Sequence, residues 1–221
     1  MIEEVSPKKP RLNQKKTSIH KKEDFRLYVA IPAVAKEHAH NLPKVKDAIA
    51  KALEGYKYDF YVAPVGGSSN QAEIVDGFNL VVETVLRLQY NYVWFVEGDV
   101  VVPPDAFTRL HAHNVDVAAG VVPYHKIAPV YENLMVAGRF LSEGSYRTVN
   151  LHKDDVKGKT LEGNVWAGSS CVLIKRGVFE SGLRYVHQLE TAGFDMLFWK
   201  SAKLRGFKIL VDGNVVCEDL G

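Results

Sequence analysis

Cysteine is scarce in this sequence, and long apolar runs are absent. The 221 residues include two cysteines, Cys171 and Cys217, and both lie in stretches rich in β-branched residues. This pattern excludes a disulfide scaffold and a cysteine zinc cluster, and it predicts two reduced thiols in buried strands. No apolar run reaches the roughly 18 residues that a membrane-spanning helix needs, and the N-terminus lacks the apolar stretch of a signal peptide. We therefore expect a cytoplasmic protein.

The formal net charge is also small, +2 at pH 7, but it is unevenly placed. Residues 1–24 are rich in lysine and have no hydrophobic period, which predicts a flexible basic tail. Two alternatives stay open for this tail: peripheral contact with an anionic membrane surface, or a solvated arm without a dedicated partner. Neither zinc-finger spacing nor an aromatic ribonucleoprotein motif occurs, so we do not expect nucleic-acid binding.

The remaining residues, 25–221, contain enough hydrophobic sequence for one domain with its own core. Periodicity predicts a series of strands and helices in which the two types alternate. In chain order these are a strand at 26–32, a helix at 42–53, a strand at 58–64, a helix opening at the capping-box sequence 70–73, a strand at 92–96, a short helix at 103–113 and a strand at 115–122. This order predicts an α/β domain with a mostly parallel sheet, helices on both faces, and ligands at the carboxyl ends of the strands.

The second half of the chain is less regular. Residues 123–163 mix glycines and charges with short hydrophobic pieces, and we expect hairpins or mobile loops over the pocket there. Regular structure is predicted again as a strand at 166–174, a helix at 194–204, and short strands at 208–211 and 215–217.

The sequence Glu97-Gly98-Asp99 follows a buried aromatic strand directly. Two acids two positions apart in an extended segment project to the same side, and the glycine leaves room for a ligand near the backbone. Mg²⁺ and Mn²⁺ prefer one or two carboxylates together with water and phosphate oxygens. The pattern therefore favours a cation site for a nucleotide diphosphate, and the alternative is an acidic turn without a ligand.

Residues 92–110 resemble the Asp-x-Asp segment of family 2-like glycosyltransferases, which have the GT-A fold. The resemblance continues in order along the chain. Residues 167–179 are similar to the small-residue turn and strand on the acceptor side of that family, residues 193–199 and 206–212 to its Glu-Asp helix start and next strand, and residues 216–221 to a terminal strand that often ends in a metal-binding histidine. The matches span roughly residues 25–221.

The resemblance implies a role for each acid. Asp99, with Glu97 beside it, would hold Mn²⁺ or Mg²⁺ on the diphosphate of a nucleotide-sugar donor. Asp195 would be the general base that takes the proton of the acceptor hydroxyl in an inverting displacement, and its alternative role is that of a helix N-cap. Asp219 stands at the position of the family's histidine and would be a third metal ligand, with Glu218 as the competing choice and a solvated terminal acid as the alternative.

Some positions depart from the family pattern. Glu97 replaces the first Asp, Phe194 stands where a Glu is usual, and residues 64–69 lack the paired acids that recognise the base. Trp166 would stack on a sugar ring or simply pack in the core, and His38 and His40 are expected to be ordinary surface residues. The candidate residues for binding the nucleotide sugar are Pro32, Ala33, Gly67, Ser68, Asn79, Glu97, Gly98, Asp99, Trp166 and Gly168.

The sequence thus predicts a metal-dependent glycosyltransferase that moves a sugar from a nucleotide-diphosphate donor to a hydroxyl of a glycan, lipid or protein. Two alternatives stay open: a sugar-phosphate nucleotidyltransferase, and a non-catalytic module with the same fold that binds a sugar nucleotide or a glycan. The first should carry a basic, glycine-rich phosphate loop near the first strand, and residues 31–35 do not have that composition.

Overall fold

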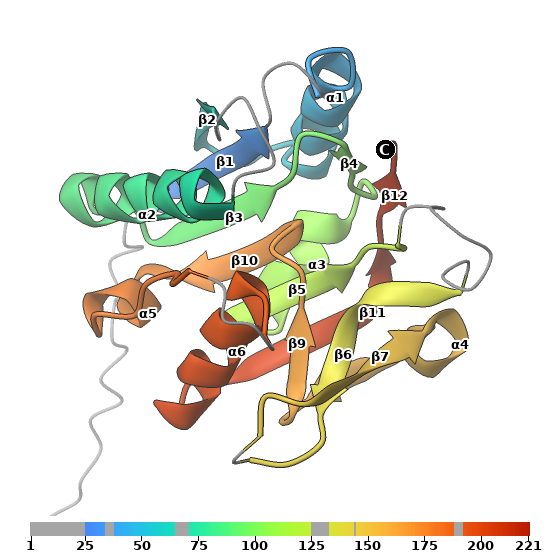
Figure 1. Ribbon diagram of the computed structural model, residues 1–221. Helices are drawn as coiled ribbons and strands as arrows, with labels where there is room; N and C mark the ends of the chain where they lie inside the picture. Colours follow the sequence, from blue (N-terminus) through green and yellow to red (C-terminus); the bar gives the residue numbers. More distant parts are fainter. Residues whose placement is uncertain (1–24, 34–37, 65–70, 125–132, 144, 188–191) are drawn as a thin grey trace, which may run out of the picture.

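The computed structural model describes residues 25–33, 38–64, 71–124, 133–143, 145–187 and 192–221 (Figure 1). The predicted basic tail, residues 1–24, lies outside these ranges, so the domain boundary at residue 25 stays a prediction. Among the helices in the described ranges, none combines the length and the apolar character needed to cross a bilayer.

The first half of the domain confirms the alternation predicted from the sequence. Its elements are β1 (Leu27–Ala33), α1 (Leu42–Ala52), β2 (Tyr58–Pro64), α2 (Gln71–Leu88), β3 (Tyr92–Val96), β4 (Val100–Val101), α3 (Ala106–Ala112) and β5 (Val117–Val121). The proposed capping residue of α2, Asn70, is outside the described residues.

The second half contains a hairpin in the region where hairpins or loops were expected, and it differs from the predicted strands in two places. Its elements are β6 (Leu134–Phe140), β7 (Thr148–His152), α4 (Lys153–Val156), β8 (Thr160–Glu162), β9 (Val165–Ala167), β10 (Cys171–Lys175), α5 (Arg176–Glu180), α6 (Phe194–Leu204), β11 (Ile209–Val216) and β12 (Glu218–Asp219). The single strand predicted at 166–174 is two strands in different sheets, because the chain turns at residues 168–170. The two strands predicted at 208–211 and 215–217 are one irregular strand, β11.

The central sheet has seven strands in the order β2-β1-β3-β10-β5-β11-β8. Pairing is parallel for β1 with β2, β1 with β3 and β5 with β11, whereas β10 runs antiparallel to both β3 and β5 and β8 antiparallel to β11. The sheet is therefore mixed, rather than mostly parallel as predicted. Because β10 runs against its neighbours, its first residue lies at the edge where β1, β3 and β5 end.

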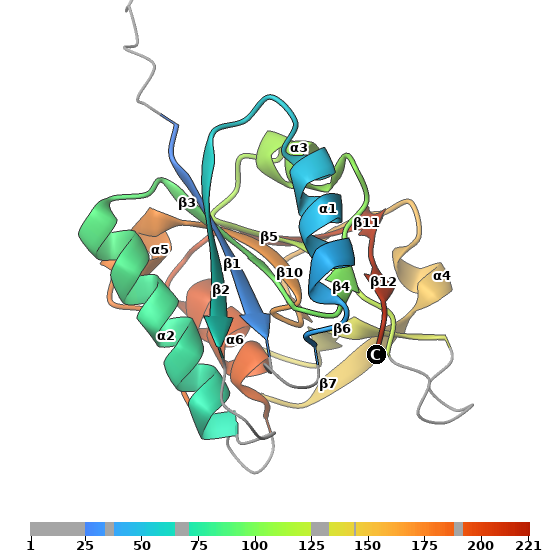
Figure 2. The same ribbon diagram turned by 90° about the horizontal axis from the view of Figure 1, so that it is seen from above.

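Helices cover both faces of this sheet, as predicted (Figure 2). The side chains of β3 alternate between the two hydrophobic cores, with Val93 and Phe95 in the core that contains α2, α5 and α6, and Trp94 and Val96 in the core that contains α1 and α3. A strand buried on both faces reads as a continuous apolar run, which explains why β3 is so apparent in the sequence. The two cysteines are buried and unpaired by disulfide, as expected.

The irregular part of β11 packs so closely against neighbouring backbone that it requires a glycine, Gly213. A Cβ at Gly213 would lie 1.8 Å from the Val156 carbonyl oxygen, and the Gly213 amide donates to the Lys159 carbonyl at 2.8 Å. Backbone atoms block this position, so no side-chain rotation can make room for a larger residue.

We therefore predict that Gly213→Ala lowers the free energy of unfolding by about 2–3 kcal/mol. Gly177→Ala is the matched control, because a Cβ there meets nothing within 4 Å; it should leave stability unchanged or raise it by less than about 1 kcal/mol. Urea denaturation of both variants measures the difference, and equal midpoints would contradict the packing described for β11.

Candidate functional site

The Glu97-Gly98-Asp99 sequence forms a turn where β3 ends, not the extended segment that we predicted. The Val100 amide donates to the Glu97 carbonyl at 3.1 Å, which closes the turn, and the Gly98 amide donates to the Pro32 carbonyl of β1 at 3.0 Å. The turn is thereby fixed against the carboxyl end of the neighbouring strand. It lies at the edge where ligands bind in α/β sheets.

The Glu97 carboxyl is partly buried and bound by one hydroxyl. Ser170 Oγ donates to Glu97 Oε2 at 2.6 Å, and the Glu97 amide donates to the Ser170 carbonyl at 3.0 Å. Burial raises the pKa of Glu97 to about 8; the Ser170 hydrogen bond opposes this shift, and the charges of Asp99, Asp195 and Asp219 add to it. The four acids therefore share one electrostatic environment.

Asp99 faces His38, which was expected to be an ordinary surface residue. His38 Nε2 lies 3.4 Å from Asp99 Oδ2, and the two side chains are 18% and 20% exposed. His38 follows β1, whose carboxyl end lies beside that of β3, so the topology brings the two residues together. Knowledge of the strand order, which the sequence did not supply, was needed to find this contact.

The C-terminal strand brings Asp219 to the same turn. β12 pairs antiparallel with β4, Asp219 opposite Val100, and the Leu220 amide donates to the Asp99 carbonyl at 2.9 Å (Figure 1). Glu218, the competing choice, is exposed and forms an ion pair with Lys44 at 3.0 Å. The arrangement favours Asp219 over Glu218 as the acid next to Asp99.

Asp195 is the second residue of α6, and its carboxyl points to a buried serine. Ser169 Oγ donates to Asp195 Oδ1 and lies 3.5 Å from the Tyr185 hydroxyl. The N-cap of α6 is Gly193, and no side chain caps this end, so the alternative role of Asp195 as N-cap is wrong. Burial raises the pKa of Asp195 to about 7, and hydrogen bonds from Ser169 oppose the shift.

The other predicted binding residues have varied surroundings. Asn79 uses its side-chain amide on the Tyr185 backbone, donating to the carbonyl at 2.9 Å and accepting from the amide at 3.1 Å. Trp166 is 5% exposed and belongs to a hydrophobic core, which favours its packing role over sugar stacking. Gly168 is buried against Val136, whose Cγ1 would be 2.7 Å from an added Cβ.

The remaining predicted residues lie at the ends of strands or outside the description. Pro32 and Ala33 end β1, directly beside the turn that carries the acids. Gly67 and Ser68 lie outside the described residues, so their role in binding a nucleotide stays a prediction.

Comparisons with known proteins locate the fold. No protein-family model and no curated protein matches the chain. Among solved structures, A197 from STIV is similar with a TM-score of 0.58 and 17% identity, over 87% of this chain and 84% of that one. The catalytic domain of Drosophila β1,4-galactosyltransferase 7, solved with xylobiose, is similar with a TM-score of 0.50 and 13% identity, over 86% of this chain and 65% of that one.

The chain has a GT-A-like fold. This confirms the fold predicted from residues 92–110 and the segments downstream. S. aureus TarS 1–349 in complex with UDP-GlcNAc also matches, with a TM-score of 0.47 and 11% identity, over 88% of this chain and 58% of that one. The chain spans less than two thirds of the TarS and galactosyltransferase structures.

The turn after β3 lies in an acidic environment, because the charges of Asp99, Asp195 and Asp219 all act on Glu97. Within the described ranges, no three His, Cys, Asp or Glu residues form a cluster with metal-ligand spacing. Likewise, no described lysine or arginine forms an ion pair with Glu97 or Asp195. The side chains at this edge that could contribute oxygen ligands to a cation are Glu97, Asp99 and Asp219, and the last two add to the raised pKa of Glu97.

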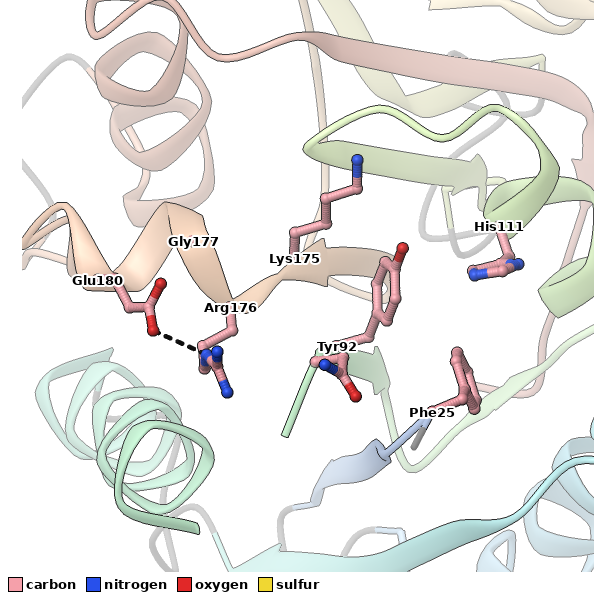
Figure 3. A pocket seen from close by; sticks show the side chains of 8 residues that line it. Phe25, Tyr92, His111, Lys175, Arg176, Gly177 and Glu180 are labelled. Carbon is pink, nitrogen blue, oxygen red and sulfur yellow. Dashed lines mark ion pairs between the residues drawn. The ribbon is translucent and has the colours of Figure 1, made fainter. Parts of the chain in front are cut away.

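A separate hollow lies at the opposite edge of the GT-A-like sheet (Figure 3). It has a volume of about 320 Å³, and its lining includes Phe25 before β1, Tyr92 at the start of β3 and Lys175 at the end of β10. Its basic side chains contact other protein groups: Lys175 Nζ donates to the Asn114 carbonyl at 2.9 Å, and Arg176 pairs with Glu180 at 2.8 Å. None of Glu97, Asp99, Asp195 and Asp219 lines this hollow, so it is distinct from the candidate site.

The raised pKa values of Glu97 and Asp195 predict how stability depends on pH. A carboxyl with a raised pKa stabilises the fold while it is protonated, so its contribution is complete below about pH 4 and is lost as the pH rises towards 7 for Asp195 and 8 for Glu97. In the absence of divalent ions, the free energy of unfolding should therefore fall between pH 5 and pH 8.

Glu97→Gln should remove part of this fall and be more stable than the wild type at pH 8 by about 1–3 kcal/mol, a range that allows for the partial exposure of Glu97. Near pH 4 the two proteins should differ little. Urea denaturation across the pH range measures the effect, and the exposed Glu54, changed to Gln, is the control. A wild type that is as stable at pH 8 as at pH 5 would contradict the burial of these acids.

Proposed function

We propose that this chain is a metal-dependent glycosyltransferase that moves a sugar from a nucleotide-diphosphate donor to a hydroxyl acceptor with inversion of configuration. The observation that carries the proposal is the presence of acids from three elements at one end of the sheet, two of them held by different serines. Glu97 and Asp99 lie in the turn after β3, with Asp219 beside them, and Glu97 accepts from Ser170; Asp195 lies at the start of α6 and accepts from Ser169. The GT-A-like fold supports this class of reaction.

On the donor side, Asp99 binds the cation, with Glu97, Asp219 and His38 as the groups around it. When bound, Mn²⁺ or Mg²⁺ neutralises negative charge on the departing nucleotide diphosphate. Excess negative charge among the acids favours entry of the ion, because a divalent cation relieves the mutual repulsion that helps to raise the pKa of Glu97. Pro32, Ala33, Gly67, Ser68 and Asn79 remain the candidate nucleotide pocket.

On the acceptor side, Asp195 takes the proton from the attacking hydroxyl. A general base works best when its pKa lies near the working pH, and the Asp195 carboxyl, with a pKa of about 7, meets this condition. The hydrogen bond from Ser169 keeps this pKa from rising further, so a substantial fraction of Asp195 is ionised near neutrality.

A thermal-shift screen of nucleotide sugars, with and without Mn²⁺, tests the proposal directly. The correct donor at about 100 times its dissociation constant should stabilise the native state by about 3 kcal/mol, which is roughly 5–10 °C for a domain of this size. The shift should require Mn²⁺, and Asp99→Asn should abolish both this shift and Mn²⁺-dependent transfer or slow hydrolysis of the donor.

Asp47→Asn, which changes an exposed acid on α1, is the matched control and should behave like the wild type. Asp99→Asn must keep the wild-type circular-dichroism spectrum. A donor that shifts melting equally in the wild type and in Asp99→Asn, with no turnover, would instead identify a binding module. The transferase proposal fails if no donor sugar is transferred or hydrolysed with Mn²⁺.

A further inference from the structure

Two consecutive serines contact an acid after β3 and an acid in α6. Ser169 and Ser170 lie in the turn that leads into β10, and they are 1% and 6% exposed. Ser170 donates to Glu97 Oε2 at 2.6 Å, and Ser169 donates to Asp195 Oδ1. The two neighbouring hydroxyls thus bind two different carboxyls, Ser170 that of Glu97 and Ser169 that of Asp195.

Burial of a hydroxyl costs free energy unless it is hydrogen-bonded, so the burial of both serines is stabilised by these carboxyls. The two hydroxyls are also attached to different parts of the fold. The Ser170 carbonyl accepts from the Glu97 amide at 3.0 Å, next to the pairing of β10 with β3. Ser170 is therefore fixed relative to the end of β3.

Ser169 contacts Tyr185, which belongs to the hydrophobic core that contains α2 and α6. The Tyr185 hydroxyl lies 3.5 Å from Ser169 Oγ, and the tyrosine ring stacks on Phe198 of α6 with centroids 4.4 Å apart. Asn79 of α2 holds the Tyr185 backbone by two hydrogen bonds. The hydroxyl that meets Asp195 is thus connected to α2 and α6, whereas the hydroxyl that meets Glu97 is connected to β3.

We propose that Ser169 and Ser170 are positioning residues with separate tasks: Ser170 orients Glu97 for the cation, and Ser169 orients Asp195 for the acceptor hydroxyl. The inference rests on the proposed function. The Ser170 hydroxyl holds Glu97 at Oε2, and Ser169 holds Asp195 through its hydroxyl at Oδ1 and through its backbone. Each carboxyl is thereby kept in one orientation, Glu97 toward the ion or its water and Asp195 toward the acceptor hydroxyl. One two-residue turn in this way sets the spacing between the donor and acceptor sides.

The test compares Ser169→Ala with Ser170→Ala in two measurements that a general loss of structure would change together. Calorimetric titration with Mn²⁺ alone gives the metal affinity without any substrate, and the pH profile of turnover, with the donor found by the screen, gives the state of the base. Ser170→Ala should weaken Mn²⁺ binding about tenfold, as loss of a hydrogen bond to a metal ligand typically does, and leave the acid limb of the profile in place.

Ser169→Ala should give the reverse result. Mn²⁺ affinity should stay within about twofold of the wild type, while turnover falls about tenfold and the acid limb moves to higher pH. The limb moves up because the lost hydrogen bond had favoured the ionised form of Asp195. Ser181→Ala is the matched control, because the exposed Ser181 hydroxyl donates to the Val178 carbonyl at 2.7 Å, away from the acids.

Ser169→Cys and Ser170→Cys fill the buried site with a slightly larger thiol, which is a weak donor, so they repeat the comparison should either alanine variant fail to fold. The proposal is overturned if both positions change Mn²⁺ affinity and the pH profile alike, or if neither changes them. A wild type that binds Mn²⁺ but transfers no sugar instead refutes the proposed function. In that case, double-mutant cycles in the free energy of unfolding, which pair Ser169→Ala and Ser170→Ala each with Asp195→Asn and with Glu97→Gln, still measure which acid each serine holds.

Discussion

The antiparallel position of β10 between β3 and β5 is the constraint on which the site depends. Parallel neighbours of β3 would deliver only the carboxyl ends of strands to this edge, whereas β10 delivers its first residues and the turn before them. That turn contains Ser169 and Ser170, and through them it reaches the end of β3 and the start of α6. If β10 were not antiparallel to β3, no single segment would donate hydrogen bonds both to Glu97 after β3 and to Asp195 in α6.

Burial determines what these acids can do. A carboxyl at the surface would be fully ionised at neutral pH, and Asp195 would then be a weak base. Partial burial against the sheet raises the pKa values of Glu97 and Asp195, and one serine hydroxyl limits the shift at each acid. The cost is a concentration of acidic groups in a poorly solvated place, which the native state tolerates by retaining protons on them.

Local patterns were sufficient to predict some elements, because their signals lie within the segment itself. The apolar run of β3 and the periodicity of α6 are examples. Residues 212–214 separate the two strands predicted at 208–211 and 215–217, but in the structure they continue one strand. Asp212 is nevertheless 2% exposed inside β11, because His113 lies 2.8 Å from its Oδ2 and the Asn214 amide donates to its Oδ1 at 2.9 Å. A buried acid satisfied by a distant histidine cannot be read from neighbouring residues.

The site itself was predictable in part for the same reason. Residues 97–99 and Asp195 have recognisable local sequences, so the sequence selects these acids as candidates, whereas the position of Asp195 inside α6 instead of at its N-cap was not foreseen. His38 and the two serines act through contacts between segments distant in the chain. Their recognition requires the strand order β1-β3-β10, which depends on tertiary packing.

The pairing of β11 with β5, and of β12 with β4, has a consequence for how the molecule is made. These contacts join segments about a hundred residues apart, and chain closure over such separations is slow. During synthesis, β5 and β4 emerge from the ribosome long before residues 209–219 exist to pair with them. In the nascent chain, β5 therefore lacks its partner β11 for some time. The acidic site is completed by β12 only after residues 209–219 have been translated.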